Sequence, residues 1–263
     1  MKKSIFTFVL SMAAVLLFAQ SQPVTWSGAL GYNPAHQPPL TLPADDLQVV
    51  PADPLLWSQG PDCNAAGTSE IISAYNLESN CADDFVFTSA KNITAAAWWF
   101  APFNGDYSTL TSWTVTIYNE AACLPANIVQ QWVIPFNMSH ELLYCPNGYY
   151  SYWADLTPAF TASANTKYWV SVQTGDHAFP PGQWGWAMHA QVSGCQGAFK
   201  SAYFGFPNYV PAGGLVFTFP TDFAFELYGT DSVIVETPIS NWALFIGIGL
   251  ILIFALVRFR RFI

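Results

Sequence analysis

The sequence predicts an all-β protein whose folded body is an antiparallel β-sandwich of jelly-roll type. Apolar and polar side chains alternate with a period of two in segments rich in aromatic and β-branched residues. Clusters of Gly, Pro and Asn bound most of these segments, and no amphipathic helical pattern separates them. Eight or more short strands joined by turns are typical of a sandwich.

The N-terminal residues 1–21 have the pattern of a secretory signal peptide. Lys2 and Lys3 precede an apolar run, and Ala19 and Ser21 supply the small residues of a cleavage site. The alternative is a membrane anchor, but about 14 apolar residues make a short span.

Residues 22–62 are dense in proline, which fixes φ and lacks the N–H that a helix needs. We therefore expect an extended lead segment, part of which docks on the body through Trp26 and Trp57.

The predicted sandwich occupies residues 63–231. Two of its segments alternate most clearly, each with three apolar residues on one face: Trp113, Val115 and Ile117 in the first, and Tyr168, Val170 and Val172 in the second.

All five cysteines lie in the predicted exported part, where disulfides are plausible. Their spacing alone leaves every pairing open. We favour the nearest neighbours, Cys63 with Cys81 and Cys123 with Cys145, each closing a loop of about 20 residues and stabilising by about 3 kcal/mol. Cys195 then remains single, as a buried apolar residue or as an intermolecular partner.

The C-terminal end has the features of a membrane segment. A linker at 232–241 leads to an apolar run at 242–257, which as a helix is about 24 Å long against a hydrocarbon core of about 30 Å. Residues 258–263 form a basic tail with Arg258, Arg260 and Arg261, which indicates a cytoplasmic end and an outward-facing body.

Pro238, Ser240 and Trp242, followed by the apolar run and the arginines, resemble the C-terminal sorting signals of the PEP-CTERM class and its Ser-x-Trp variants. The resemblance implies processing by a membrane-embedded, exosortase-type transpeptidase; an ordinary single-pass anchor is the alternative. The body resembles the β-sandwich ectodomains of bacterial surface proteins in "CADDFVF", "WTVTIYNE", "YSYWADL", "KYWVSV" and "FAFELYG". That resemblance implies a fold and no settled activity.

Charge excludes nucleic acid as a partner. All 17 acidic residues and only three lysines, Lys91, Lys167 and Lys200, lie between residues 22 and 237. Such a surface repels a phosphate backbone.

Catalytic signatures are missing from the sequence. "HELLY" at 140–144 begins like a zinc-protease helix, but Tyr144 stands where the second histidine is needed. No nucleophile elbow and no glycine-rich phosphate loop occurs, and the four histidines are scattered. We therefore expect a protein without enzymatic activity.

Acidic residues offer one metal hypothesis, a structural calcium ion held by Asp83 or Asp84 together with Asp222 or Glu226. Asp83 and Asp84 are neighbours on a predicted strand and therefore point to opposite faces. Solvated turn carboxylates are the alternative, and no other cofactor is expected.

Four tryptophans are candidate ligand contacts. Trp184 and Trp186 share a strand face that could form a platform for a sugar ring, although packing in the core is the commoner role. Trp98 and Trp99 are adjacent, so one of them faces away from the core and is the better ligand candidate.

Together these features predict an exported, non-catalytic module at the cell surface that contributes to adhesion or to an extracellular polymer matrix. A carbohydrate-binding module with exposed tryptophans and a secreted hydrolase are the alternatives. A hydrolase would need a cleft holding two carboxylates or a metal ion.

Overall fold

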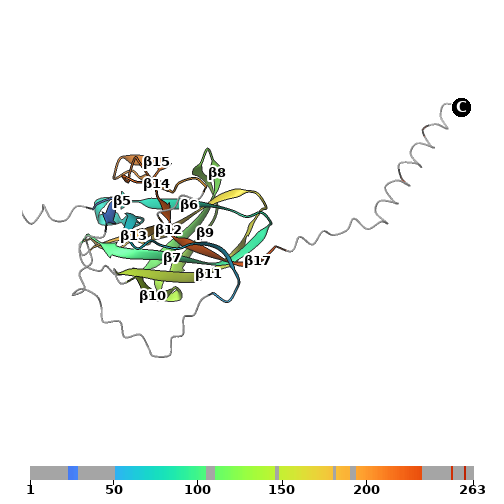
Figure 1. The fold of residues 1–263 in the computed structure, drawn as a ribbon, viewed down its shortest axis with the longest axis horizontal. Coiled ribbons are helices and arrows are strands. Elements are labelled where there is room, and N and C mark those ends of the chain that lie inside the picture. The colour runs from blue at the N-terminus through green and yellow to red at the C-terminus, as the bar shows by residue number, and fades with distance from the viewer. Residues whose placement is uncertain are drawn as a thin grey trace, which may run out of the picture. The chain divides into compact units, whose positions relative to one another are not determined.

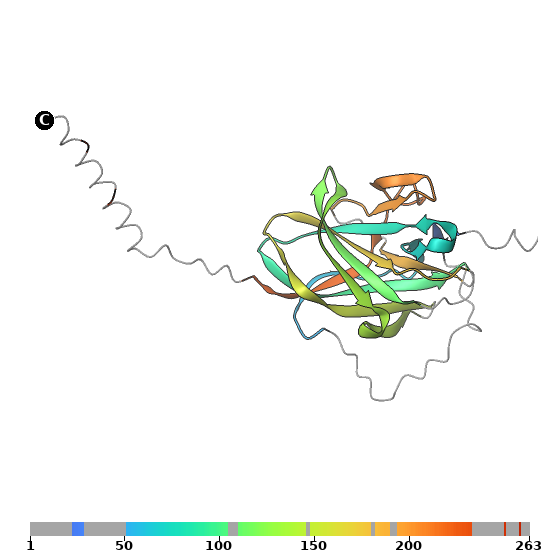
Figure 2. The same ribbon diagram turned by 180° about the vertical axis from the view of Figure 1, so that it is seen from behind.

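A computed structural model of the chain describes residues 23–28, 51–104, 110–145, 148–179, 182–189 and 194–232, together with Leu250 and Arg258. The chain divides into two compact units, with the boundary after Asp231. The first unit is the β-sandwich-like body shown in Figures 1 and 2. Of the second unit the structure describes Ser232, Leu250 and Arg258 alone.

Within the described residues, the larger sheet of the body has nine strands. Its main path runs β1 (Trp26–Gly28), β3 (Ala65–Thr68), β13 (Gln183–His189), β7 (Lys91–Phe103), β11 (Tyr149–Ala162) and β10 (His140–Cys145). The long strand β7 also pairs with β17 (Phe225–Asp231), which in turn pairs with β2 (Leu55–Gln59), and β16 (Asp222–Phe223) pairs with β13.

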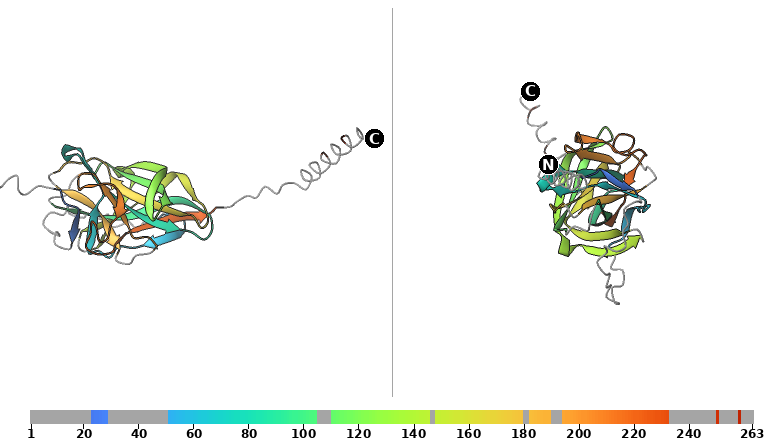
Figure 3. Two further views of the ribbon diagram at one scale, coloured as in Figure 1. Left: turned by 90° about the horizontal axis from the view of Figure 1, so that it is seen from above. Right: turned by 90° about the vertical axis from the view of Figure 1, so that its left-hand side faces the viewer.

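The smaller sheet faces the larger one and has six strands in the part of the chain that the structure describes. Its order is β15 (Phe206–Pro211), β14 (Ala198–Ser201), β6 (Asn80–Val86), β12 (Lys167–Thr174), β8 (Ser112–Ala121) and β9 (Leu124–Pro135). The strands β4 (Ile71–Ile72) and β5 (Leu77–Glu78) form a separate two-stranded hairpin. The strand pairs in both sheets are antiparallel, as the sequence predicts, and the two layers are visible in the end view of Figure 3.

The core lies between the two sheets and is rich in aromatic rings. Trp113, Val115 and Ile117 of β8 are fully buried in it, so the predicted alternation of this strand is confirmed. The ring of Trp113 lies 5.6 Å from that of Trp98 and 4.8 Å from that of Phe100, both on β7 of the opposite sheet. Burying each such ring contributes about 3 kcal/mol, so these contacts hold the layers together.

The proline-rich lead segment contributes two strands to the larger sheet. β1 pairs with β3 and β2 pairs with β17, so the sheet takes in residues before the predicted start at 63. Trp57 stacks on Phe225 at 6.3 Å between ring centroids and packs against Phe85, which confirms that part of the segment docks. The side chain of Trp26 lies outside the described residues.

The terminal predictions fall on residues that the structure does not describe. These are the signal peptide at 1–21, the sorting motif with Pro238, Ser240 and Trp242, the membrane helix at 242–257 apart from Leu250, and Arg260 and Arg261. Within the described residues, no helix has the length and apolarity needed to cross a membrane.

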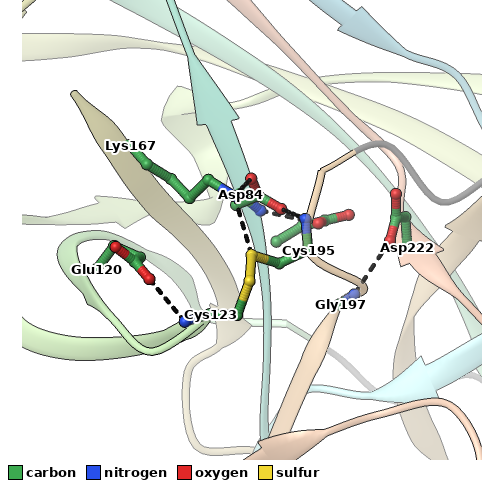
Figure 4. The surroundings of a disulfide bond; sticks show 8 residues. Asp84, Glu120, Cys123, Lys167, Cys195, Gly197 and Asp222 are labelled. Carbon is green, nitrogen blue, oxygen red and sulfur yellow. Dashed lines mark hydrogen bonds and ion pairs between the residues drawn. A yellow bond between two sulfur atoms is a disulfide. The ribbon is translucent and has the colours of Figure 1, made fainter. Parts of the chain in front are cut away.

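The predicted cysteine pairing is wrong. Cys123 forms a disulfide with Cys195, with 5.6 Å between their Cα atoms, while Cys81 is a free thiol buried in the core. Cys63 is also disulfide-bonded, and the side chain of Cys145 lies outside the described residues. Nearest neighbours in sequence are not nearest in space here, because the turn between β8 and β9 reaches the segment that leads into β14 (Figure 4).

Candidate binding groove

The outer face of the smaller sheet carries polar side chains beside a small buried apolar cluster that includes Ala82, Tyr118 and Trp169. The alternation that buries Val115 and Ile117 inward turns Thr116 of β8 outward, and the register places Ser171 of β12 opposite it. Gln131 of β9 continues this polar row and donates a hydrogen bond to the Thr116 hydroxyl at 2.9 Å. Thr116 and Ser171 are themselves buried, so this part of the row of hydrogen-bonding side chains is not open to solvent.

A groove of about 430 Å³ opens beside this polar face, between strands β9 and β15. These strands stand at opposite ends of the sheet order, yet they approach each other here. The β9 side supplies apolar side chains, including Pro125 and the exposed Ile128, and the β15 side supplies Asn208 and Tyr209. Its volume is in the range of sites that bind small molecules.

A chain of hydrogen bonds fixes the two tyrosines of the groove. The Tyr209 hydroxyl donates to Asn80 Oδ1 at 2.9 Å, and Asn80 Oδ1 also accepts a hydrogen bond from Ser171. Since the single proton of Tyr209 is used in this way, the Tyr118 hydroxyl, 3.2 Å away, is the donor to Tyr209. Burial, reinforced by Tyr118, raises the pKa of Tyr209, so this phenol stays neutral at physiological pH.

Lys200 of β14 also lines the groove and supplies its positive charge. Its Nζ lies 5.4 Å from the centroid of the Tyr209 ring, within the range of a cation–π contact. None of the described residues that line the groove is acidic. The groove therefore combines apolar walls, phenol hydroxyls and one positive charge.

A second cluster supports the tip of the β8–β9 hairpin (Figure 4). The β9 strand of this hairpin lines the groove. Lys167 Nζ lies 3.0 Å from Asp84 Oδ2 and 2.9 Å from Cys195 Sγ, and the Cys195 N–H donates to Asp84 Oδ1 at 2.8 Å. Burial raises the pKa of Asp84, an effect that Lys167 partly offsets. With the Cys123–Cys195 bond, these contacts clamp the hairpin to the segment before β14.

The four tryptophans singled out in the sequence are all buried. Trp98, Trp184 and Trp186 belong to the core between the sheets, in agreement with the commoner role considered for the last two. Trp99 does face the opposite side from Trp98, as predicted. It nevertheless packs against Tyr149 and neighbouring alanines and is only 4% exposed, so the expectation that the outward-facing member of the pair is a ligand contact is wrong.

The four carboxylates of the calcium hypothesis do not gather in one place. Asp83 lies in the core near Asp222, whereas Asp84 lies on the opposite face with Lys167. Glu226 accepts a hydrogen bond from Ser58. Within the described ranges, no group of three or more His, Cys, Asp or Glu side chains could hold a metal ion.

The Asp83 carboxylate instead serves the structure of the core. It accepts hydrogen bonds from the side chain of Gln59 at 2.7 Å and from the Phe223 N–H at 2.5 Å, which links β6 to β2 and β16. Burial, followed by the nearby charge of Asp222, raises the pKa of Asp83.

Glu70 and His177 form a buried hydrogen-bonded pair that the sequence does not predict. His177 Nε2 lies 2.8 Å from Glu70 Oε2, and both side chains are inaccessible to solvent. The Glu70 carboxylate also accepts hydrogen bonds from Thr68, from the Gln183 side chain and from the Trp184 N–H. Through these hydrogen bonds Glu70, which directly precedes β4, ties together β13 and the segment that follows β12.

Sequence reasoning missed the residues of the groove. Tyr118 is the one groove residue with a weak sequence indication of its role, because it is an aromatic residue on the polar face of an otherwise clearly alternating strand. Lys200 and Tyr209 gave none, because only the fold brings β15 across to β9.

Comparison with known proteins gives one match. A family model described as a domain of unknown function (DUF7901) matches residues 55–227. The matched range begins with β2 and ends within β17, so it includes every strand that forms the groove. No curated protein and no solved structure matches the chain.

Proposed function

The chain belongs to the DUF7901 family, and we propose that it is an exported, non-catalytic binding module that contributes to adhesion or to an extracellular matrix. Its binding site is the groove between β9 and β15. The observation that carries this proposal is the groove itself, a preformed hollow on a rigid sheet with apolar walls and fixed hydroxyl groups.

Export is supported by the oxidised cysteines. Cys123 is bonded to Cys195 and Cys63 is also disulfide-bonded. Disulfides persist in oxidising compartments and are rare in the cytosol. They agree with the signal-peptide pattern at 1–21 and with the positive charge that follows the apolar run at 242–257.

For the tail, we propose display at the cell surface through the PEP-CTERM-like segment, with processing by an exosortase-type enzyme. The mass of the mature protein tests this step. Loss of residues 258–263 is expected, whereas a mature chain that retains Arg258 through Ile263 would identify a plain membrane anchor.

Carbohydrate binding is the ligand class that the groove favours. A pyranose ring has apolar C–H faces and a rim of hydroxyl groups, and the groove places the exposed side chain of Ile128 across from the exposed polar side chain of Asn208. This assigns the sugar contacts to the groove and not to the buried tryptophans. We take the body to be a variant of the jelly roll, an architecture that occurs in lectin domains.

Filling the groove tests the proposal directly. Ala126 is an exposed residue in the groove wall, and Ala126→Trp places a large ring there without disturbing the core. The matched control is Ala164→Trp, at an exposed position in the turn between β11 and β12.

The full-length chain, purified in mild detergent, is applied to a glycan array and to its own cells' extracellular polymer. We expect Ala126→Trp to lose binding at least tenfold and Ala164→Trp to bind like the wild type. Binding that survives Ala126→Trp would refute the groove as the site.

A further inference from the structure

We propose that the groove recognises a glycan carrying a single carboxylate, such as one uronic acid on an otherwise neutral chain, and that Lys200 is the residue that selects it. This inference rests on the proposed function and names the ligand class of the same site. It follows from the partners of the three lysines in the acidic body.

Two of these lysines have carboxylate partners. Lys91 pairs with Asp231 at the sheet edge, and Lys167 pairs with Asp84 beneath the hairpin tip. Lys200 differs, because no carboxylate of the described residues lies within ion-pair distance of its Nζ. In a body with 17 acidic residues, a lysine without such a partner that lines a groove is available to a ligand anion.

The surroundings of Lys200 hold its charge over the groove. Its backbone pairs with Asn80 in the middle of the sheet, so its side chain leaves a fixed point on the outer face. The ammonium group then lies against the Tyr209 ring, whose π-face attracts it. Tyr209 is in turn held by its hydrogen bonds to Asn80 and Tyr118.

The charge of the whole body limits the ligand to few negative charges. A polyanion would meet long-range repulsion from the acidic surface, which salt screens only beyond about 8–10 Å. A lone carboxylate brought against Lys200 forms one charge-assisted hydrogen bond, while the neutral sugars occupy the apolar part of the groove. One cation and apolar walls thus match a mostly neutral glycan with one acid group.

A matched pair of ligands tests this selection. A xylo-oligosaccharide bearing one glucuronate branch is compared with its methyl ester, which lacks the negative charge and adds one methyl group. Binding of the full-length chain in mild detergent is measured by titration calorimetry for the wild type, Lys200→Met, Lys200→Arg and, as control, Lys91→Met.

We expect the wild type to bind the acid about tenfold or more tightly than the ester, which corresponds to about 1.4 kcal/mol. Lys200→Met should bind both ligands equally, Lys200→Arg should keep the preference, and Lys91→Met should behave as the wild type. Equal binding of acid and ester by the wild type, or no binding of either, would overturn the inference.

The groove-filling variant separates this outcome from failure of the proposed function. If acid and ester bind equally and Ala126→Trp abolishes both, the groove remains the site and only the charge selection is lost. If Ala126→Trp leaves binding unchanged, the groove itself is not the site and both proposals fall.

Discussion

Removing the Cys123–Cys195 disulfide should destabilise the body strongly, since it closes a long loop. The two cysteines are 72 residues apart in sequence. For a loop of that length, the chain-entropy relation gives a stabilisation of about 4.4 kcal/mol at 25 °C. Lys167 and Asp84 keep their ion pair when the disulfide is removed. Most of the lost stability therefore comes from the larger conformational entropy of an unfolded chain that is no longer cross-linked.

The double variant Cys123→Ala, Cys195→Ala is compared with the wild type by urea unfolding. We expect the free energy of unfolding to fall by about 4 kcal/mol and the m-value to rise, because the unfolded chain is no longer cross-linked. Cys81→Ala is the control, since it leaves both disulfides intact and removes only core packing and the hydrogen bond from the Cys81 thiol to the Thr68 carbonyl. A loss below about 1 kcal/mol in the double variant would refute the reasoning.

Two further predictions concern buried carboxylates. Burial and Asp222 raise the pKa of Asp83, so the folded state holds a proton that the unfolded state releases above its ordinary carboxyl pKa of about 4. The stability that this group contributes is therefore complete at low pH and lost as pH rises. The unfolding free energy of Asp83→Asn should decline less from pH 4 upward than that of the wild type. Parallel curves of unfolding free energy against pH for the two proteins would contradict this. Gly194 has φ +90°, and a Cβ there would lie 2.7 Å from Asp84 Oδ2, so Gly194→Ala should cost about 2 kcal/mol or more in urea unfolding.

A matched glycine separates the cost of the left-handed backbone from the cost of the steric contact with Asp84 in the Gly194→Ala prediction. Gly205 has φ +88°, yet a Cβ there meets no atom within 4 Å. Gly205→Ala should therefore cost about 1 kcal/mol, the penalty of the left-handed backbone alone. Equal costs at the two glycines would show that Asp84 and its cluster tolerate displacement.

Much of the fold can be predicted from the sequence because strand periodicity is a local property. Trp113, Val115 and Ile117 face the core as the alternation requires, and Asp83 and Asp84 point to opposite faces. These results follow from backbone geometry, in which successive Cβ atoms of a strand alternate.

Periodicity does not say what covers the second face of a strand. Trp99 is turned away from the inter-sheet core as predicted, but Tyr149 and small side chains bury it there. Exposure depends on neighbouring segments, so it is decided by tertiary packing and cannot be obtained from the strand itself.

The sequence by itself determined the strand class of the body, the face to which each side chain points and the imbalance between acidic residues and lysines. Only the tertiary structure decided that Cys123 meets Cys195 and that Tyr118, Lys200 and Tyr209 share a groove. The physical reason is that alternation and charge are carried by adjacent residues, whereas these contacts join strands that are far apart along the chain and meet only when the sheets pack.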